Sequence, residues 1–237
     1  MYRKELRYYF STPIAYIVIG LYLLAVSLLL WVIPGEWNIP QSGYAQADGL
    51  FRLSPWLFML LCPALTMRLF TEERQTGTWM LLRTKPVSLL RITTSKMLAA
   101  WTVVVLAQLP CLVHYALVYS LAEPAGNIDS GAFFGSFLGL LFLSAVFTSI
   151  GTWASTLSRS QIVAFITGAA CCFICYWGFD LLASIFSGHM QAALQWCGLN
   201  SHYASISRGV IDLRDVIFFL SESLIFVLLS VQSMKRK

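Results

Sequence analysis

Six stretches of the chain have the length and composition of membrane-spanning helices, with about 20 mostly apolar residues each. Only 11% of the 237 residues are charged, whereas a soluble domain carries roughly 25%. A chain with so few charged side chains cannot cover a surface that faces water, so lipid must surround most of it. We therefore predict an all-α, polytopic membrane protein with six transmembrane helices in a single domain. The predicted spans are 14–33, 53–70, 97–121, 132–157, 161–186 and 216–234.

The distribution of lysine and arginine predicts how these spans are oriented. If the first residues lie in the cytoplasm, 13 of the 16 basic residues fall on the cytoplasmic side, and only Arg52, Arg208 and Arg214 fall outside. Cytoplasmic loops of membrane proteins carry an excess of lysine and arginine. The pattern predicts that both termini are cytoplasmic and that the number of spans is even. Orientation in the membrane therefore explains the net charge of +5, and we expect no nucleic-acid partner.

Sequence motifs for nucleotide hydrolysis and metal binding are absent. No Gly-Lys dipeptide occurs, so the chain lacks the G-x-x-x-x-G-K-[ST] loop that cradles phosphates. The three histidines, His114, His189 and His202, do not have the spacing of a zinc protease, and no Cys/His cluster has metal-ligand spacing. We therefore expect a chain that is not an enzyme and that has no catalytic residue, cofactor or metal of its own.

The segment 71–88, between the second and third predicted spans, has the features of a lever on the cytoplasmic side. It contains a charged turn, then Gly77, then a short amphipathic stretch, and it stops at Pro86. Glycine permits a sharp backbone turn, and proline prevents the stretch from continuing directly into the next span. A cytoplasmic protein that grips such a segment can move both adjoining spans. The alternative is an ordinary interfacial helix between two spans.

This segment resembles the cytoplasmic coupling segment of ABC-2 type permeases, which typically read acid-acid-x-x-x-Gly-Thr-x-x-x-Leu-Leu-x-x-Pro-hydrophobic-Ser. The match runs from Glu72 to Ser88, at the place where that family carries it. Over essentially the whole chain, the sequence is also similar to the gliding-motility-associated Gld transporter permease subunit of the F type. The stretches that carry this second resemblance are 10–16, 35–39, 63–68, 161–165 and 205–212.

The resemblance implies an ABC-2 (type V exporter-like) permease fold in a bacterial inner membrane, with a role in gliding motility or secretion. It also implies a separate ABC ATPase subunit in two copies, which binds ATP and Mg, and a second permease that is identical or a relative with an outer domain. The segment 187–215 is expected to form short outer helices that dip into the membrane. The residues expected to couple to the ATPase are Glu72, Glu73, Arg74, Gly77, Thr78, Trp79, Leu81, Leu82 and Pro86.

One position departs from the family pattern. Many ABC-2 permeases carry an acid shortly after the Gly-Thr pair, where this chain has Met80. The departure removes one ion pair that the family would form with its ATPase. Glu72 and Glu73 are then the acids left to meet basic residues of a partner.

Three ionisable residues fall inside predicted spans, and three glycines recur at a fixed spacing. His114, Asp180 and Glu222 lie at a similar depth, about 9–11 Å below the outer surface by the helical rise of about 1.5 Å per residue. They are expected to form either a polar patch on the substrate path or a hydrogen-bonded packing network. The glycines Gly131, Gly135 and Gly139 are expected to let another helix approach closely, within the bundle or across a permease dimer.

Two functions of other classes compete with the permease. A membrane scaffold that docks a cytoplasmic partner without translocating anything would carry a similar docking segment. An intramembrane enzyme would need a convergent catalytic set, and only His114, Asp180 and Glu222 could supply one.

Overall fold

The computed structural model describes the whole chain except residues 45, 80–86, 125, 210–211 and 236–237. Every regular element in the described residues is a helix. Six helical stretches, some composed of consecutive helices, are long and apolar enough to cross a membrane, which confirms the predicted all-α, six-span fold. These helical stretches are Ile14–Val32, Asp48–Gln75, Leu89–Leu121, Ser130–Leu157, Gln161–Ala183 and Leu213–Lys235.

One helix, α9 (Ser130–Leu157), is the centre of the bundle, and most of its residues are buried. Buried hydroxyl side chains on α9 donate hydrogen bonds to its own backbone. The Thr148 and Thr152 hydroxyls, for example, each donate to the carbonyl oxygen four residues earlier at 2.7 Å. This bonding lets polar residues enter an apolar core without unsatisfied groups. The helices that pack against α9 include α4 (Asp48–Thr66), α7 (Leu89–Gln108), α10 (Gln161–Phe173) and α14 (Leu213–Lys235).

Three of the spanning stretches contain a π-helical or 3-10 turn. The first passes from α2 (Ile14–Ser27) into a π-helical turn at Leu28–Val32. In the third, a 3-10 turn at Leu109–Cys111 separates α7 from α8 (Leu112–Leu121), and Pro110 explains it because proline has no amide hydrogen for the helical ladder. The fifth continues from α10 through a π-helical turn at Ile174–Gly178 into α11 (Phe179–Ala183).

Two helical stretches extend beyond the apolar runs from which their spans were predicted. The second runs through α4 and α5 (Arg68–Gln75), from residue 48 to residue 75, against a predicted span of 53–70. The third starts at Leu89, eight residues before the predicted 97, because the Ser88 hydroxyl caps α7 by accepting from the Arg91 amide at 3.3 Å. Helices therefore continue past the apolar runs into polar residues, and the membrane limits within them remain predictions.

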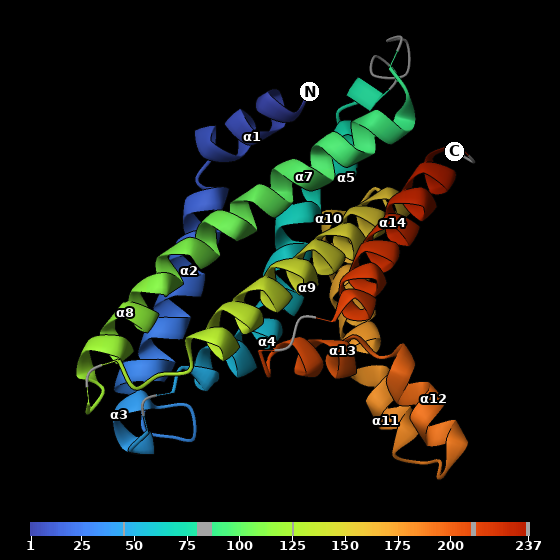
Figure 1. Ribbon diagram of the computed structural model, residues 1–237. Coiled ribbons are helices and arrows are strands. Elements are labelled where there is room, and N and C mark those ends of the chain that lie inside the picture. The colour runs from blue at the N-terminus through green and yellow to red at the C-terminus, as the bar shows by residue number, and fades with distance from the viewer. Residues whose placement is uncertain (45, 80–86, 125, 210–211, 236–237) are drawn as a thin grey trace.

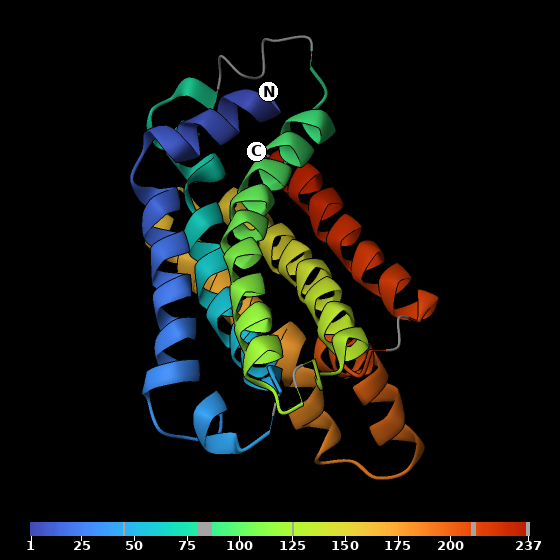
Figure 2. The same cartoon turned by 60° about the vertical axis from the view of Figure 1, so that its left-hand side comes forward.

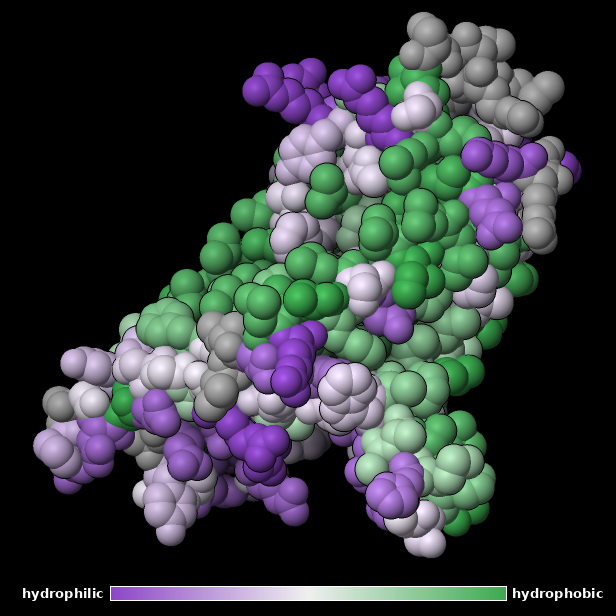
Figure 3. Space-filling model, turned by 45° about the vertical axis from the view of Figure 1, so that its right-hand side comes forward, coloured by the Kyte–Doolittle hydropathy of each residue, from purple (hydrophilic) through white to green (hydrophobic). Residues whose placement is uncertain are grey.

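Both ends of the described chain lie at one end of the bundle, where α1 (Tyr2–Ser11) crosses the tops of the spans (Figures 1 and 2). The opposite end carries α3 (Ile39–Ser42), α12 (His189–Cys197) and α13 (Leu199–Ile206) (Figure 1). Figure 3 shows hydrophobic side chains over the middle of one face, with hydrophilic side chains towards the two ends. This pattern is that of a protein whose middle faces lipid.

Candidate coupling site

The chain turns sharply after α5, at the end of the bundle that holds both termini. Gly77 has a φ of +74°, a left-handed conformation that favours glycine. The Thr76 hydroxyl donates to the Glu72 carbonyl oxygen at 2.9 Å and lies 2.9 Å from the Thr78 hydroxyl. The turn is therefore closed by its own side chains, and residues 75–78 are exposed at its tip.

Trp79 follows the turn and is buried against the end of α5. Its ring makes an edge contact with Phe70 at a centroid distance of 6.1 Å. The Arg74 guanidinium lies 6.0 Å from the Trp79 ring centroid, within the range of a cation–π interaction. The tryptophan therefore fixes the chain after the turn to the helix before it.

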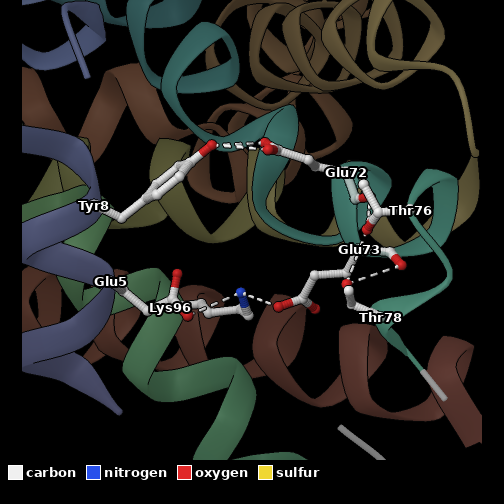
Figure 4. A network of polar contacts seen from close by, with 7 residues as sticks. All are labelled: Glu5, Tyr8, Glu72, Glu73, Thr76, Thr78 and Lys96. Atoms are coloured by element: carbon white, nitrogen blue, oxygen red, sulfur yellow. Dashed lines mark hydrogen bonds and ion pairs between the residues drawn. The ribbon is translucent and has the colours of Figure 1, made fainter. Parts of the chain in front are cut away.

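A buried ion network joins α1, α5 and α7 at this site (Figure 4). The Lys96 ammonium on α7 lies 2.8 Å from Glu73 Oε1 on α5 and 3.1 Å from Glu5 Oε1 on α1. The Lys96 side chain is only 5% exposed, and the Glu5 and Glu73 side chains are 17% and 20% exposed. Withdrawing charges from water is costly unless they are closely paired, so the three residues depend on one another.

A second contact joins α1 to α5 beside this network (Figure 4). The Tyr8 hydroxyl donates to both carboxylate oxygens of Glu72, at 2.8 and 3.0 Å. Partial burial raises the pKa of Tyr8, and its hydrogen bond to Glu72 raises it further. The neighbouring Tyr9 hydroxyl donates to the Leu65 carbonyl oxygen at 2.9 Å. Through these bonds, α1 is held on α4 and α5 as well as on α7.

The end of α5 is also bonded to the carboxyl end of α9. The Arg74 guanidinium donates to the Thr156 carbonyl oxygen in the last turn of α9 at 2.6 Å, and the Gln75 side-chain amide donates to the Arg159 carbonyl oxygen, two residues beyond α9, at 2.8 Å. Carbonyl groups in the last turn of a helix have no partner within the helix, so side-chain donors stabilise them. A displacement of the turn would therefore be passed to α1, α7 and α9 together.

The structure describes six of the nine residues expected to couple to an ATPase, and it places them around this turn. Leu81, Leu82 and Pro86 lie outside the described residues, as does Met80. Glu72 and Glu73 both have partners within the chain, Tyr8 and Lys96, so the acids expected to meet a partner protein hold the site itself together. The exposed surface of the turn is instead formed by residues 75–78.

The three ionisable residues of the spans have separate surroundings. His114 is buried, and its Nδ1 accepts a hydrogen bond from the Trp31 indole at 2.9 Å. Asp180 accepts from the Asn200 side-chain amide at 2.7 Å, and Glu222 is half-buried on α14. Within the described part of the chain, no hydrogen bond or ion pair connects any two of the three. Their described hydrogen bonds therefore do not join them into one polar cluster.

The spaced glycines of α9 face α13 and the residues that follow it. A Cβ added to Gly135 would lie 2.9 Å from Gly209 Cα, and one added to Gly139 would lie 3.0 Å from Ile206 Cγ2. At Gly131 it would meet only Asp129 Oδ1, at 3.4 Å. Gly135 and Gly139 therefore allow the outer segment to pack onto the bundle within this chain.

Two residues of the coupling site, Lys96 and Glu5, were not predicted from the sequence. Lys96 directly precedes the apolar run that begins at Met97, and Glu5 is the one acid among the first ten residues. The buried Lys96–Glu5 pair depends on the packing of α1 against α7. A charge directly beside an apolar helix is the available signal, but its partner is 91 residues away in sequence.

Comparison with known proteins shows the family to which the chain belongs. A family model described as ABC-2 family transporter protein matches residues 38–199, which is more than half of the chain. No curated protein matches the chain. With six helices that can cross a membrane, the chain belongs to the ABC-2 transporter family and is the multi-pass membrane subunit, or permease, of an ABC transporter.

Proposed function

We propose that this permease couples ATP hydrolysis by a separate ABC ATPase to the translocation of a substrate, and that the ATPase grips the turn at residues 75–78. The observation that carries the proposal is the set of bonds around this turn. Glu73 joins it to α1 and α7 through Lys96, and Arg74 and Gln75 join it to the end of α9. A push on an exposed turn that is fixed in this way moves several spans at once.

The proposed complex follows the composition that the family implies. Two ATPase subunits bind ATP and Mg on the cytoplasmic side and close on each other, and each presses on one permease. The second permease is another copy of this chain or a related subunit with an outer domain. Because α5 continues α4 after a break at Met67, movement of the turn passes directly into the second span.

The contact surface on this chain is the exposed tip of the turn. Gln75, Thr76, Gly77 and Thr78 are all exposed, whereas Glu72 and Glu73 are occupied by Tyr8 and Lys96. We therefore assign the acids to transmission of the movement and the turn to contact with the ATPase. Gliding motility or secretion is the proposed process, and it rests on the resemblance to the Gld permease alone.

Replacement of Gly77 by alanine is expected to release the ATPase. Alanine is strained at φ +74°, so the turn changes shape at the proposed contact, although no heavy atom lies within 4 Å of an added Cβ. The measurement is the amount of ABC ATPase, identified by mass spectrometry, that co-purifies with the tagged permease in mild detergent. We expect most of the ATPase to be lost.

Gly43→Ala is the matched control for this substitution. Gly43 also has a positive φ, +68°, and open space around an added Cβ, but it follows α3 at the opposite end of the bundle. It should retain the ATPase. Equal loss in both variants, or no loss in Gly77→Ala, would contradict the proposed contact. Retention of an ATPase without any transport would instead support a docking scaffold.

The cysteines allow the proposed orientation to be measured. Cys197, at the end of α12, is exposed, and the other five cysteines are buried or half-buried in helices. If the end with both termini is cytoplasmic, a membrane-impermeant maleimide should label Cys197 in intact spheroplasts of a bacterial host. Thr78→Cys in a Cys197→Ser background should be labelled only after the membrane is opened. The reverse pattern would overturn the orientation and the coupling proposal.

A further inference from the structure

A cavity of about 470 Å³ lies between α1, α7 and the junction of α4 with α5, beside the ion network of the coupling site. Its volume is in the range of sites that hold small molecules. Part of its wall is apolar and is formed by Ile14, Leu65 and Leu69. Ile14 is the first residue of the first candidate span, so the cavity lies at one end of the spanning helices, where the membrane surface is expected.

The charged side chains that line the cavity balance one another. Three are cations and three are carboxylates, so the lining has no formal net charge and favours neither a simple anion nor a simple cation. The six are Lys4, Arg68, Lys96, Glu5, Glu72 and Glu73.

Some of these charges have no partner within the part of the chain that the structure describes. Lys96 pairs with Glu5 and Glu73, and Glu72 accepts from Tyr8. The side chains of Lys4 and Arg68 make no hydrogen bond or ion pair with any described residue, and Arg68 Nε is buried without a partner. Glu73 Oε2 is also buried without a partner. Those two buried atoms are closed to the cavity, which therefore presents the unpaired Lys4 ammonium and Arg68 guanidinium as donors and the carboxylates of its lining as acceptors.

We propose that this cavity binds the headgroup of an ethanolamine phospholipid. A phosphate group matches the free donors of Arg68 and Lys4, because guanidinium and ammonium groups form strong hydrogen bonds to phosphate oxygens. A primary ammonium, which has three hydrogen-bond donors, matches the carboxylates of Glu72 and Glu73 in the lining. The apolar wall of Ile14, Leu65 and Leu69 accommodates the beginning of the acyl chains.

A lipid fits this cavity better than a small soluble zwitterion because charged groups and an apolar wall occur together. Free phosphoethanolamine would leave the apolar wall unused. A choline headgroup has the phosphate but no N–H to donate to the carboxylates of the lining, and a glycerol headgroup has no cation. Comparison of the ethanolamine lipid with free phosphoethanolamine, a choline lipid and a glycerol lipid therefore separates the contributions of apolar contact, N–H donors and positive charge to binding.

The test measures binding of short-chain lipids to the purified permease alone, by native mass spectrometry in detergent. We expect phosphatidylethanolamine to bind more tightly than phosphatidylcholine, phosphatidylglycerol or free phosphoethanolamine. Arg68→Gln should weaken phosphatidylethanolamine binding about ten- to a hundredfold, the effect of losing a hydrogen bond to a charged group. Because no ATPase is present, failure of the coupling proposal would leave this result unaffected.

Two further variants keep the test decisive. Arg7→Gln removes an exposed cation of α1 that does not line the cavity, and it should bind the lipid as the unmodified protein does. Lys4→Gln changes an exposed side chain of the lining and should weaken binding even if Arg68→Gln does not fold. Equal binding of the choline and ethanolamine lipids, or equal binding by the Lys4 and Arg7 variants, would overturn the proposal. Displacement of the lipid by free phosphoethanolamine or inorganic phosphate at equal concentration would assign the site to a soluble ligand and overturn it as well.

Discussion

Lys96→Met is expected to destabilise the permease by about 3 kcal/mol, near the lower end of the range for removing one partner of a buried ion pair. The substitution leaves the Glu5 and Glu73 carboxylates next to each other without their shared cation. Those side chains are 17% and 20% exposed, so water relieves part of the penalty. The measurement is the midpoint of thermal unfolding in detergent. Loss of the ion bridge through which α7 joins α1 and α5 should also abolish stimulation of the partner ATPase by substrate.

Neutralising the acids together with the lysine separates charge burial from packing. In the triple variant Lys96→Met, Glu5→Gln and Glu73→Gln, no uncompensated charge remains, so most of the lost stability should return. Lys235→Met removes an exposed lysine at the end of α14 and should change stability by no more than about 0.5 kcal/mol. If the triple variant were as unstable as Lys96→Met, the network would not act through charge.

The fold could be predicted from the sequence because lipid imposes a simple requirement on it. Each spanning helix must be apolar over about 20 residues, and local composition shows this without knowledge of any contact. Gly77 is a similar case, since its position after a run of charged residues indicated the turn that its φ of +74° confirms. The ends of the helices were less predictable, because α7 begins at a serine cap well before its apolar run.

The coupling network could not be predicted because it depends on which helix faces which. Counting basic residues predicts that Lys96 lies on the cytoplasmic side, but it cannot show that Lys96 lies between Glu5 and Glu73. The same limit applies to His114 and Asp180. Their similar predicted depth in the membrane made mutual contact possible. In the structure, the His114 side chain instead bonds to Trp31 and the Asp180 side chain bonds to Asn200.

Gly151→Leu is expected to prevent correct packing of α9 against α4, at a cost of at least about 3 kcal/mol, since overpacking a tight core is strongly destabilising. A Cβ at Gly151 would lie 3.2 Å from Pro63 Cα and would overlap the Thr66 hydroxyl. That hydroxyl is buried and donates to the Cys62 carbonyl oxygen, so its displacement would also break a hydrogen bond. The measurements are the yield of monodisperse protein and the midpoint of thermal unfolding.

Gly20→Leu is the control, because Gly20 also lies in a spanning helix but has no heavy atom within 4 Å of an added Cβ. Gly20 is exposed on α2, so the leucine side chain would project into lipid, and helix propensity favours leucine over glycine by somewhat less than about 1 kcal/mol. Gly20→Leu should therefore unfold at the same temperature as the unmodified protein or higher. If Gly151→Leu were equally stable, the close approach of α9 to Pro63 would not be a feature of the folded permease. The second span, which α5 connects to the proposed ATPase contact, would then not be fixed to the central helix at this point.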